Sequence, residues 1–303
     1  MMRIFKSILS GAAHLPLCIL YGFADAVSLL LFHIVRYRRK VVDENLEICF
    51  PELDKAARRR IARSFYRNFA DYVVETVKLL HISNEEMSRR MEFGNMEIIE
   101  SLLDSGRDVT AYFAHCGNWE WVTSITLHSR HALTDTRYCQ IYRPLNNRGF
   151  DALMLGIRSR FGTLSIPKST AFRTLLRLRR SGIRTVTGFM SDQKASHGDP
   201  TLPLRFLGRT TSFITGTETL ARKTGNAAVY LDMHKLGRGH YRLTVRLLSE
   251  NVALEPAGSV TSRYAAMLEE TIRRNPSIWL WSHRRWKWER QDANEQETAA
   301  THE

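Results

Sequence analysis

The chain has 303 residues, enough for one large α/β domain or two small ones. With 44% hydrophobic and 10% aromatic residues it can bury a full core, which excludes a globally disordered protein. Lys and Arg outnumber Asp and Glu by 44 to 31, so the formal charge is +13 and the expected partners are anionic: nucleic acid, anionic lipid or an acidic protein.

The cysteines are scattered along the chain and include no C-x-x-C pair. They are Cys18, Cys49, Cys116 and Cys139. This spacing predicts reduced thiols of a cytoplasm-facing protein, with neither a zinc cluster nor a disulfide framework. Cys116 lies beside a histidine, so it is a candidate nucleophile. A free cysteine more usually serves as a small buried apolar residue, and that interpretation is favoured.

The N-terminal 40 residues carry a mostly apolar run at residues 15–35, which is followed by a basic cluster at residues 36–40. The run is long enough to span a bilayer, although Pro16, Asp25 and His33 interrupt it. Two interpretations remain open: an imperfect span, or helices lying in the membrane interface with the basic residues on the head groups. If the run spans, the positive-inside rule places everything after Lys40 in the cytoplasm.

Helical and strand patterns alternate through the rest of the chain. Helices are predicted at residues 41–52, 54–81, 95–105, 119–129, 148–161, 169–180, 216–224 and 259–275, and strands at residues 109–114, 136–142, 162–166, 184–190, 227–234 and 241–248. This alternation predicts an α/β fold with a mostly parallel sheet and helices on both faces. We divide the chain into an anchor at residues 1–40, a catalytic domain at residues 41–290 and a disordered tail at residues 291–303.

The stretch 109–120 reads Val-Thr-Ala-Tyr-Phe-Ala-His115-Cys-Gly-Asn-Trp-Glu120. A buried strand is predicted to end at His115, Gly117 permits a tight turn, and Asn118 is a suitable N-cap for the next helix. The spacing allows the Glu120 carboxylate to fold back onto the His115 imidazole, as a general base requires. Backbone N–H groups at this helix start, near Asn118, are candidates for stabilising an oxyanion.

Further candidates lie where other predicted elements end. Arg143, Arg158 and Arg160 are candidate phosphate ligands, because guanidinium groups bind phosphate in a bidentate manner. Asp192 and Gln193 follow a predicted strand, so they are placed at the same sheet edge as His115. We group Asn118, the three arginines, Asp192 and Gln193 as substrate-binding candidates.

Several short motifs in this order together resemble the lipid A biosynthesis acyltransferases, late lauroyl and myristoyl transferases within the lysophospholipid acyltransferase superfamily. The motifs are His115-Cys-Gly-Asn-Trp-Glu120, Ser191-Asp192-Gln193, Phe206-Leu-Gly208 followed by Gly216 and Ala221, Trp281-Ser-His283-Arg284-Arg285-Trp286-Lys287 after Pro276, and an N-terminal set of Tyr37-Arg38, Asn45-Leu46 and Phe50-Pro51-Glu52. The resemblance extends from about residue 15 to residue 288. Some relatives carry Asp where this chain has Glu120.

The resemblance implies an inner-membrane enzyme whose catalytic domain faces the cytoplasm. It implies transfer of a fatty acyl chain from an acyl carrier protein thioester to a hydroxyl of a lipid A precursor, with His115 and Glu120 as the catalytic pair. No metal or other cofactor is expected, because a thioester, on carrier protein or on coenzyme A, is already activated. The charge of +13 suits both an acidic carrier protein and an anionic glycolipid.

Two alternatives remain open. The same chemistry can act on another acceptor, such as an aminolipid, a phosphatidylinositol mannoside or a lysophospholipid. Alternatively, the Trp- and Arg-rich segment at residues 276–288 can stack nucleic-acid bases on a basic surface, although that reading leaves the His115 stretch unexplained. The same segment also fits a membrane interface or a packed core.

Overall fold

The computed structural model describes residues 2–132, 134–196 and 198–286, with side chains from Phe5 onward. Its centre is a seven-stranded sheet with the order β1-β9-β8-β2-β5-β3-β4. Five strands are mutually parallel: β2 (Val109–Phe113), β3 (Thr136–Tyr142), β4 (Leu164–Pro167), β5 (Arg184–Met190) and β8 (Ala227–Gly237). β9 (His240–Ser249) returns antiparallel to β8, and β1 (Met91–Gly94) runs parallel to β9 at the edge. The predicted mostly parallel α/β fold is therefore confirmed.

Helices cover both faces of this sheet, because alternate residues of each central strand point to opposite sides. On one face Tyr112 of β2 contacts Tyr264 of α10 (Ser259–Arg274), with ring centroids 5.0 Å apart. On the other face Ala111 and Phe113 face η2 (Trp119–His128), a 3₁₀ helix. The remaining helices around the sheet are α5 (Asn84–Arg90), α6 (Met96–Asp104), α7 (Arg148–Arg158), η3 (Lys168–Thr170), α8 (Ala171–Arg180), α9 (Gly216–Thr224) and η4 (Val252–Leu254).

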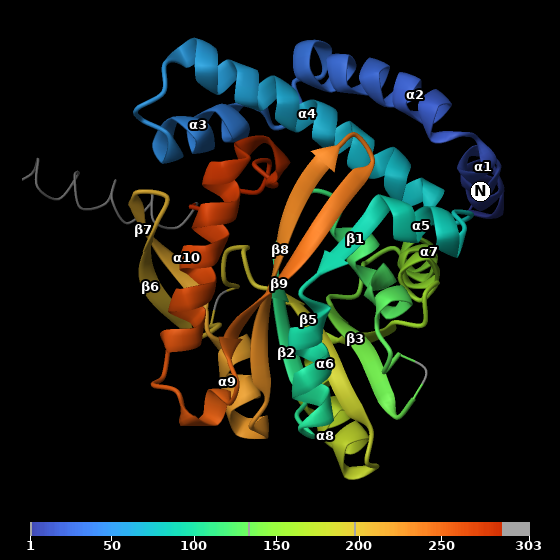
Figure 1. Ribbon diagram of the computed structural model, residues 1–303. Helices are drawn as coiled ribbons and strands as arrows, with labels where there is room; N and C mark the ends of the chain where they lie inside the picture. The colour runs from blue at the N-terminus through green and yellow to red at the C-terminus, as the bar shows by residue number, and fades with distance from the viewer. Residues whose placement is uncertain (1, 133, 197, 287–303) are drawn as a thin grey trace, which may run out of the picture.

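A two-stranded antiparallel hairpin stands beside α10 (Figure 1). It consists of β6 (Thr201–Phe206) and β7 (Arg209–Ile214), which turn at Leu207 and Gly208. Gly208 has φ +79°, a left-handed backbone that glycine adopts without a steric cost. The Phe206-Leu-Gly208 motif therefore forms the turn between the two strands.

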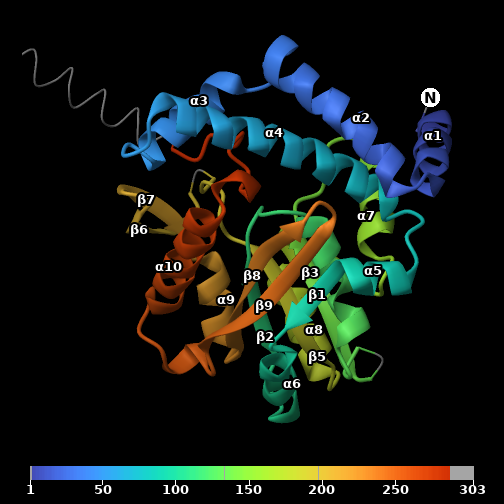
Figure 2. The same cartoon turned by 45° about the horizontal axis from the view of Figure 1, so that its top comes forward.

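The N-terminal helices run across the edge of the sheet to which the parallel strands point (Figure 1). They are α1 (Met2–His14), α2 (Leu17–Leu29), the π-helical η1 (Leu30–Ile34), α3 (Arg39–Cys49) and the long α4 (Lys55–Lys78). Figure 2 shows α2 lying along α4, and the contacts between these two helices are extensive. Leu17–Ile34 is the stretch long and apolar enough to cross a membrane by length and composition.

The Trp-rich segment packs into the core. Trp279, Trp281 and Trp286 are buried, and Trp279 lies next to a 3₁₀ turn, η5 (Pro276–Ile278). Because these indoles are enclosed, the core-packing interpretation of this segment is correct and the three rings are not a surface for stacking bases. Trp288 and the predicted tail at residues 291–303 lie outside the described residues.

Candidate active site

His115 lies just past the end of β2, at the turn that leads into η2. Gly117 makes this turn possible: its φ is +57°, and a Cβ there would come within 3.1 Å of Met233 and Tyr241 side-chain atoms. The main chain on both sides is tied to the C-terminal segment, since the Gly117 N–H donates to the Ile278 carbonyl (2.9 Å) and the Leu280 N–H donates to the His115 carbonyl (3.1 Å). The histidine is thus held on a rigid turn.

Asp192 is the carboxylate that meets His115. It follows β5, the strand paired with β2, and its Oδ1 lies 2.8 Å from His115 Nδ1. Its Oδ2 accepts the main-chain N–H of His115 (3.1 Å) and the indole N–H of Trp279 (2.9 Å). Burial raises the pKa of Asp192, but the charge of His115 and these hydrogen bonds outweigh it and hold the pKa at about 2. The carboxylate is therefore ionised at neutral pH.

The second ring nitrogen of His115 is not bound by Asp192 and lies next to Gln193. Gln193 Nε2 lies 3.3 Å from His115 Nε2, and the His115 side chain retains 14% of its surface exposed. With Nδ1–H donated to Asp192, Nε2 carries the lone pair that a general base needs. The Trp119 ring stands edge-on to the imidazole at 5.2 Å and itself stacks on Tyr72 of α4.

Glu120 points away from His115, toward α7. Its two oxygens accept a fork of hydrogen bonds from Arg158, at 2.8 Å from Nε and 2.7 Å from Nη2. The predicted contact between Glu120 and the imidazole is therefore not the one that the structure shows. The physical reason is the strand order, which brings Asp192 of the neighbouring strand to the imidazole, while the 3₁₀ turn carries Glu120 toward Arg158.

The other predicted site residues are dispersed. Asn118 is fully buried and occupies the predicted N-cap position of η2, but its side chain makes no capping hydrogen bond and its amide donates to Glu75 instead (2.9 Å). Arg160 donates to the main-chain carbonyls of Leu80 and Ile82. Arg143 is exposed, in the loop after β3. Of the predicted set, the structure brings Asp192 and Gln193 to His115.

Cys116 is enclosed next to the histidine, and burial raises the pKa of its thiol well above the usual range. A thiol in this state is a poor nucleophile. Among the described residues, no three His, Cys, Asp or Glu side chains converge as a metal site would require.

Two contributors to the site were not predicted from the sequence. Trp279 donates to Asp192, and His283 Nε2 accepts the main-chain N–H of Lys194 at 3.2 Å. Both residues come from the Trp-rich segment, whose alternation of aromatic and basic residues was the one signal of a special role.

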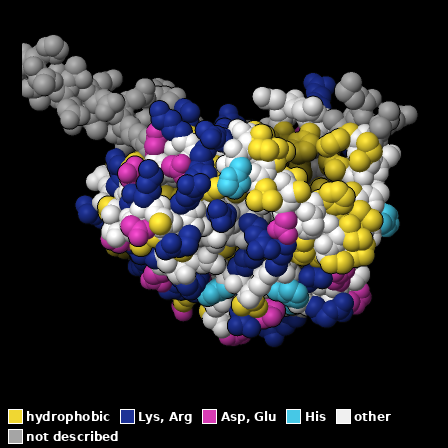
Figure 3. All heavy atoms as spheres, turned by 90° about the horizontal axis from the view of Figure 1, so that it is seen from above, with side chains coloured by type: hydrophobic (Ala, Val, Ile, Leu, Met, Phe, Trp, Pro, Cys, Tyr) yellow, Lys and Arg dark blue, Asp and Glu magenta, His cyan; other side chains and the backbone are white. Residues whose placement is uncertain are grey.

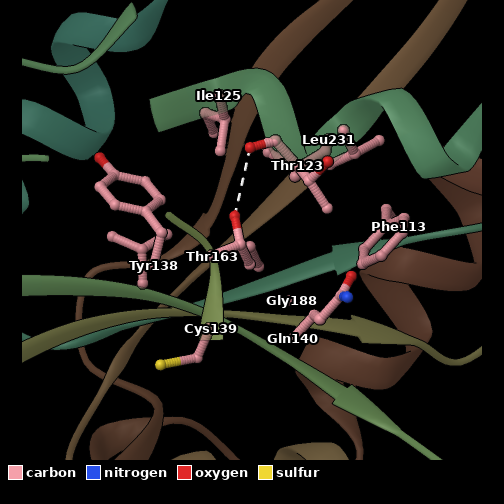
Figure 4. Close-up of a pocket in the computed structure, with 12 residues that line it drawn as sticks. Phe113, Thr123, Ile125, Tyr138, Cys139, Gln140, Thr163, Gly188 and Leu231 are labelled. Atoms are coloured by element: carbon pink, nitrogen blue, oxygen red, sulfur yellow. Dashed lines mark hydrogen bonds between the residues drawn. The ribbon is translucent and has the colours of Figure 1, made fainter. Parts of the chain in front are cut away.

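An apolar cavity of about 30 Å³ lies between the sheet and η2 (Figure 4). Phe113 and Gly188 line it, and they precede His115 and Asp192 on their strands. Thr163 closes one side with a hydrogen bond to the Thr123 carbonyl (3.2 Å). The remaining lining is mostly apolar and includes Ala111, Val122, Ile125 and Val186.

A histidine–carboxylate pair at the strand ends of a mostly parallel sheet is suited to an enzyme that activates a hydroxyl or water by general base catalysis. The comparisons with known proteins give the particular family. Residues 4–288 match the family model described as bacterial lipid A biosynthesis acyltransferase. The chain belongs to this family and is an acyltransferase.

Curated relatives agree with this assignment. The chain is 22% identical over 274 residues to a lipid A biosynthesis lauroyltransferase of Escherichia coli (strain K12), covering 90% of this chain and 87% of the relative. It is also 22% identical over 276 residues to a lipid A biosynthesis palmitoleoyltransferase of the same strain and to a lipid A biosynthesis acyltransferase of Shigella flexneri, covering 90% of this chain and 86% of each.

Proposed function

We propose that this protein transfers a fatty acyl chain from an acyl carrier protein thioester to a hydroxyl of a lipid A precursor. Family membership and the names of the relatives support the acceptor. The observation that carries the chemistry is the pair formed by His115 Nδ1 and Asp192 Oδ1 at 2.8 Å, which leaves Nε2 beside the Gln193 amide. Coenzyme A remains the alternative thioester carrier, and other lipids remain alternative acceptors.

In the proposed reaction His115 Nε2 takes the proton of the acceptor hydroxyl as its oxygen attacks the thioester carbonyl carbon. The carbon–sulfur bond then breaks, the ester is complete, and the imidazolium returns its proton to the leaving thiolate. Asp192 holds the ring by Nδ1 and stabilises the positive charge that the ring carries between the two transfers. Main-chain N–H groups at the start of η2 are the proposed donors to the developing oxyanion.

In this proposal the orienting role assigned to Glu120 passes to Asp192, and Glu120 instead braces the turn through Arg158. Fewer of the three arginines remain candidates for binding an acceptor phosphate. Arg158 and Arg160 have protein partners, whereas Arg143 is exposed on the loop that follows β3. Arg143 is therefore the strongest of the three candidates for binding an acceptor phosphate.

The acyl chain requires an apolar path, and the cavity between the sheet and η2 has an apolar lining that includes Phe113, two residues before His115. At about 30 Å³ the cavity has room for one or two water molecules, so an acyl chain enters only if lining side chains move. We place the proximal end of the chain between Phe113 and η2. Glycine at position 188 leaves room for the Phe113 ring, because a Cβ there would come within 2.9 Å of that ring.

The proposed location is the cytoplasmic surface of the inner membrane, with α2 lying in the interface. The apolar stripe along α2 and η1 is exposed, at 60% for Phe23 and 75% for Ile34, and it consists of Ile19, Phe23, Val27, Leu30 and Ile34. The opposite face is docked on α4, so a spanning α2 would draw charged residues of α4 into lipid. Figure 3 shows the apolar patch beside a field of Lys and Arg on the same face, which suits an anionic bilayer.

The test is reconstitution of the purified full chain with labelled acyl carrier protein or acyl-coenzyme A and with a lipid A precursor or a lysophospholipid. We expect an ester on the lipid A precursor, formed preferentially from the carrier-protein thioester and identified by mass spectrometry. Acylation of the lysophospholipid alone would overturn the proposed acceptor. Transfer from coenzyme A alone would overturn the proposed donor. Mass spectrometry of lipids from cells with and without the gene gives the same answer in vivo.

A further inference from the structure

A carboxylate buried behind the catalytic turn connects that turn to helix α2. Glu75 of α4 has no exposed surface. Its Oε1 accepts the Tyr21 hydroxyl of α2 (2.9 Å), and its Oε2 accepts the Asn118 amide (2.9 Å) and the Tyr241 hydroxyl of β9 (3.0 Å). One side chain thus joins the N-terminal helix, the sheet and the turn that carries His115.

The main chain at the same position holds the turn a second time. The Glu75 carbonyl accepts the indole N–H of Trp121 at 3.1 Å. Asn118 and Trp121 flank Trp119, whose ring stands against the His115 imidazole. The path of the chain from His115 into η2 is therefore fixed from behind by α4.

A second set of polar contacts holds α2 at Asp25, one turn after Tyr21. Arg238, at the tip of the β8–β9 hairpin, donates to Asp25 of α2 through both Nη atoms (2.9 Å each) and to Asp71 of α4 (2.6 Å). Its Nη2 also donates to the Tyr21 carbonyl (3.1 Å). Helix α2 is consequently seated through Tyr21 and Asp25, on groups that also contact the sheet and α4.

This arrangement is sensitive to the loss of any one donor. Burial raises the pKa of Glu75, while the Asn118 hydrogen bond and the nearby charge of Lys235 oppose that shift. A buried carboxylate that loses a hydrogen-bond donor recruits another or shifts its position, because an unsatisfied buried acceptor is costly. Tyr21 and Asn118 share this carboxylate, so a change at Tyr21 is expected to alter the hydrogen bond to Asn118.

We propose that Glu75 is a positioning residue that couples the seating of helix α2 to the geometry of the His115 turn, so that turnover depends on α2 being docked. The inference rests on the proposed function and extends it, because it makes the membrane-facing helix part of the active-site framework. Membrane contact would then act on catalysis through Tyr21 and Glu75 as well as by bringing the enzyme to its lipid.

The test compares full-length Tyr21→Phe and Tyr241→Phe with the wild type in detergent solution, where membrane binding does not limit the rate. Tyr37→Phe is the matched control, since it removes a hydroxyl from the N-terminal segment and its ring packs on Phe69, away from Glu75. For Tyr21→Phe we expect kcat per folded molecule to fall about two- to thirtyfold with the acceptor KM unchanged. We also expect faster amide hydrogen exchange at residues 115–121, a segment that does not contain the substituted residue.

A double variant separates coupling from general loosening. If Tyr21 acts through Asn118, then Tyr21→Phe combined with Asn118→Ala should lower kcat by less than the product of the two single effects. Wild-type kcat, or wild-type exchange at residues 115–121, in Tyr21→Phe would overturn the coupling, as would fully multiplicative effects in the double variant. A wild-type enzyme without transfer to any acceptor would instead refute the proposed function, and hydrogen exchange would still decide whether α2 and the turn are coupled.

Discussion

Two residues of the same short turn each pair with a side chain from another element, and the two pairs differ in how exposed they are. In the first, His115 meets Asp192, and the imidazole side chain keeps 14% of its surface exposed. In the second, Glu120 meets Arg158 in a two-bond fork, and the Glu120 side chain is only 3% exposed. In the first pair the carboxylate binds one ring nitrogen and the other lies 3.3 Å from the Gln193 amide nitrogen, whereas the second pair uses both carboxylate oxygens internally.

This difference shows that a histidine and a carboxylate five positions apart need not act on each other. The first pair joins neighbouring parallel strands, so it lies where such sheets bind ligands. The second joins η2 to α7 and supports the turn from its far side. If the two pairs have separate roles, changes to the first should mainly lower turnover and changes to the second should mainly lower stability.

The largest effect is expected for His115→Ala. Removing the general base should lower kcat by about 10²- to 10⁴-fold, because the acceptor hydroxyl loses the group that takes its proton. Cys116→Ala is the control: it changes the adjacent residue, whose buried thiol has a raised pKa, and should keep most of the activity. Both variants would be matched by circular dichroism and melting before assay. A fully active His115→Ala would end the proposed mechanism, and a dead Cys116→Ala with a trapped acyl group would point to the thiol.

The next effect is expected for Asp192→Asn. The amide has nearly the same shape but lacks the charge that stabilises the imidazolium, so kcat should fall by about 10²-fold or more with acceptor KM little changed. Trp279→Phe removes a donor to the same carboxylate and should cause a smaller loss. Normal turnover in Asp192→Asn, together with a strong loss in Glu120→Gln, would restore Glu120 to the orienting role.

The order of elements and the edge of the sheet that carries the site could be predicted from the sequence. Strands Thr136–Tyr142 and Arg184–Met190 and helix Gly216–Thr224 match their predicted bounds, because each has a clear period and clear ends. Met91–Gly94 was missed, since a four-residue strand has little period and exists through pairing with β9, far along the chain.

The partners within the site could not be predicted in the same way. His115, Asp192 and Gln193 were placed at one edge because parallel strands end together. Which carboxylate reaches His115 depends on β2 and β5 being neighbours in the sheet, and that order is a property of the whole fold. Likewise, the sequence around Arg158 does not indicate that its guanidinium group pairs with Glu120.

The second pair should matter more for stability than for the chemical step. Glu120→Gln leaves the Arg158 guanidinium without its ionic partner, and breaking a buried ion pair in this way costs about 3–5 kcal/mol of unfolding free energy. Replacing both residues, as Glu120→Gln with Arg158→Met, removes the unpaired charge and should recover part of that loss. Urea unfolding of the single and double variants measures both effects. An unfolding free energy unchanged in Glu120→Gln would show that the pair does not brace the turn.

The smallest effect concerns the pH dependence of stability at His283, beside the first pair. Burial lowers the pKa of His283 to about 4, from an unperturbed value of 6.5, although the charge of Asp192 opposes the shift. Because the pKa is lower in the folded state, the unfolded chain takes up the proton first as the pH falls. The contribution of His283 is therefore fully present above about pH 6.5 and is lost as the pH falls toward about 4. His283→Gln keeps an acceptor for the Lys194 N–H but does not titrate, so its stability should fall less than that of the wild type over this window. The measurement is the urea midpoint of both proteins at several pH values, where the titrations common to both cancel in the difference. Parallel curves from pH 7.5 to pH 4.5 would show that His283 is not held neutral by its burial beside Asp192.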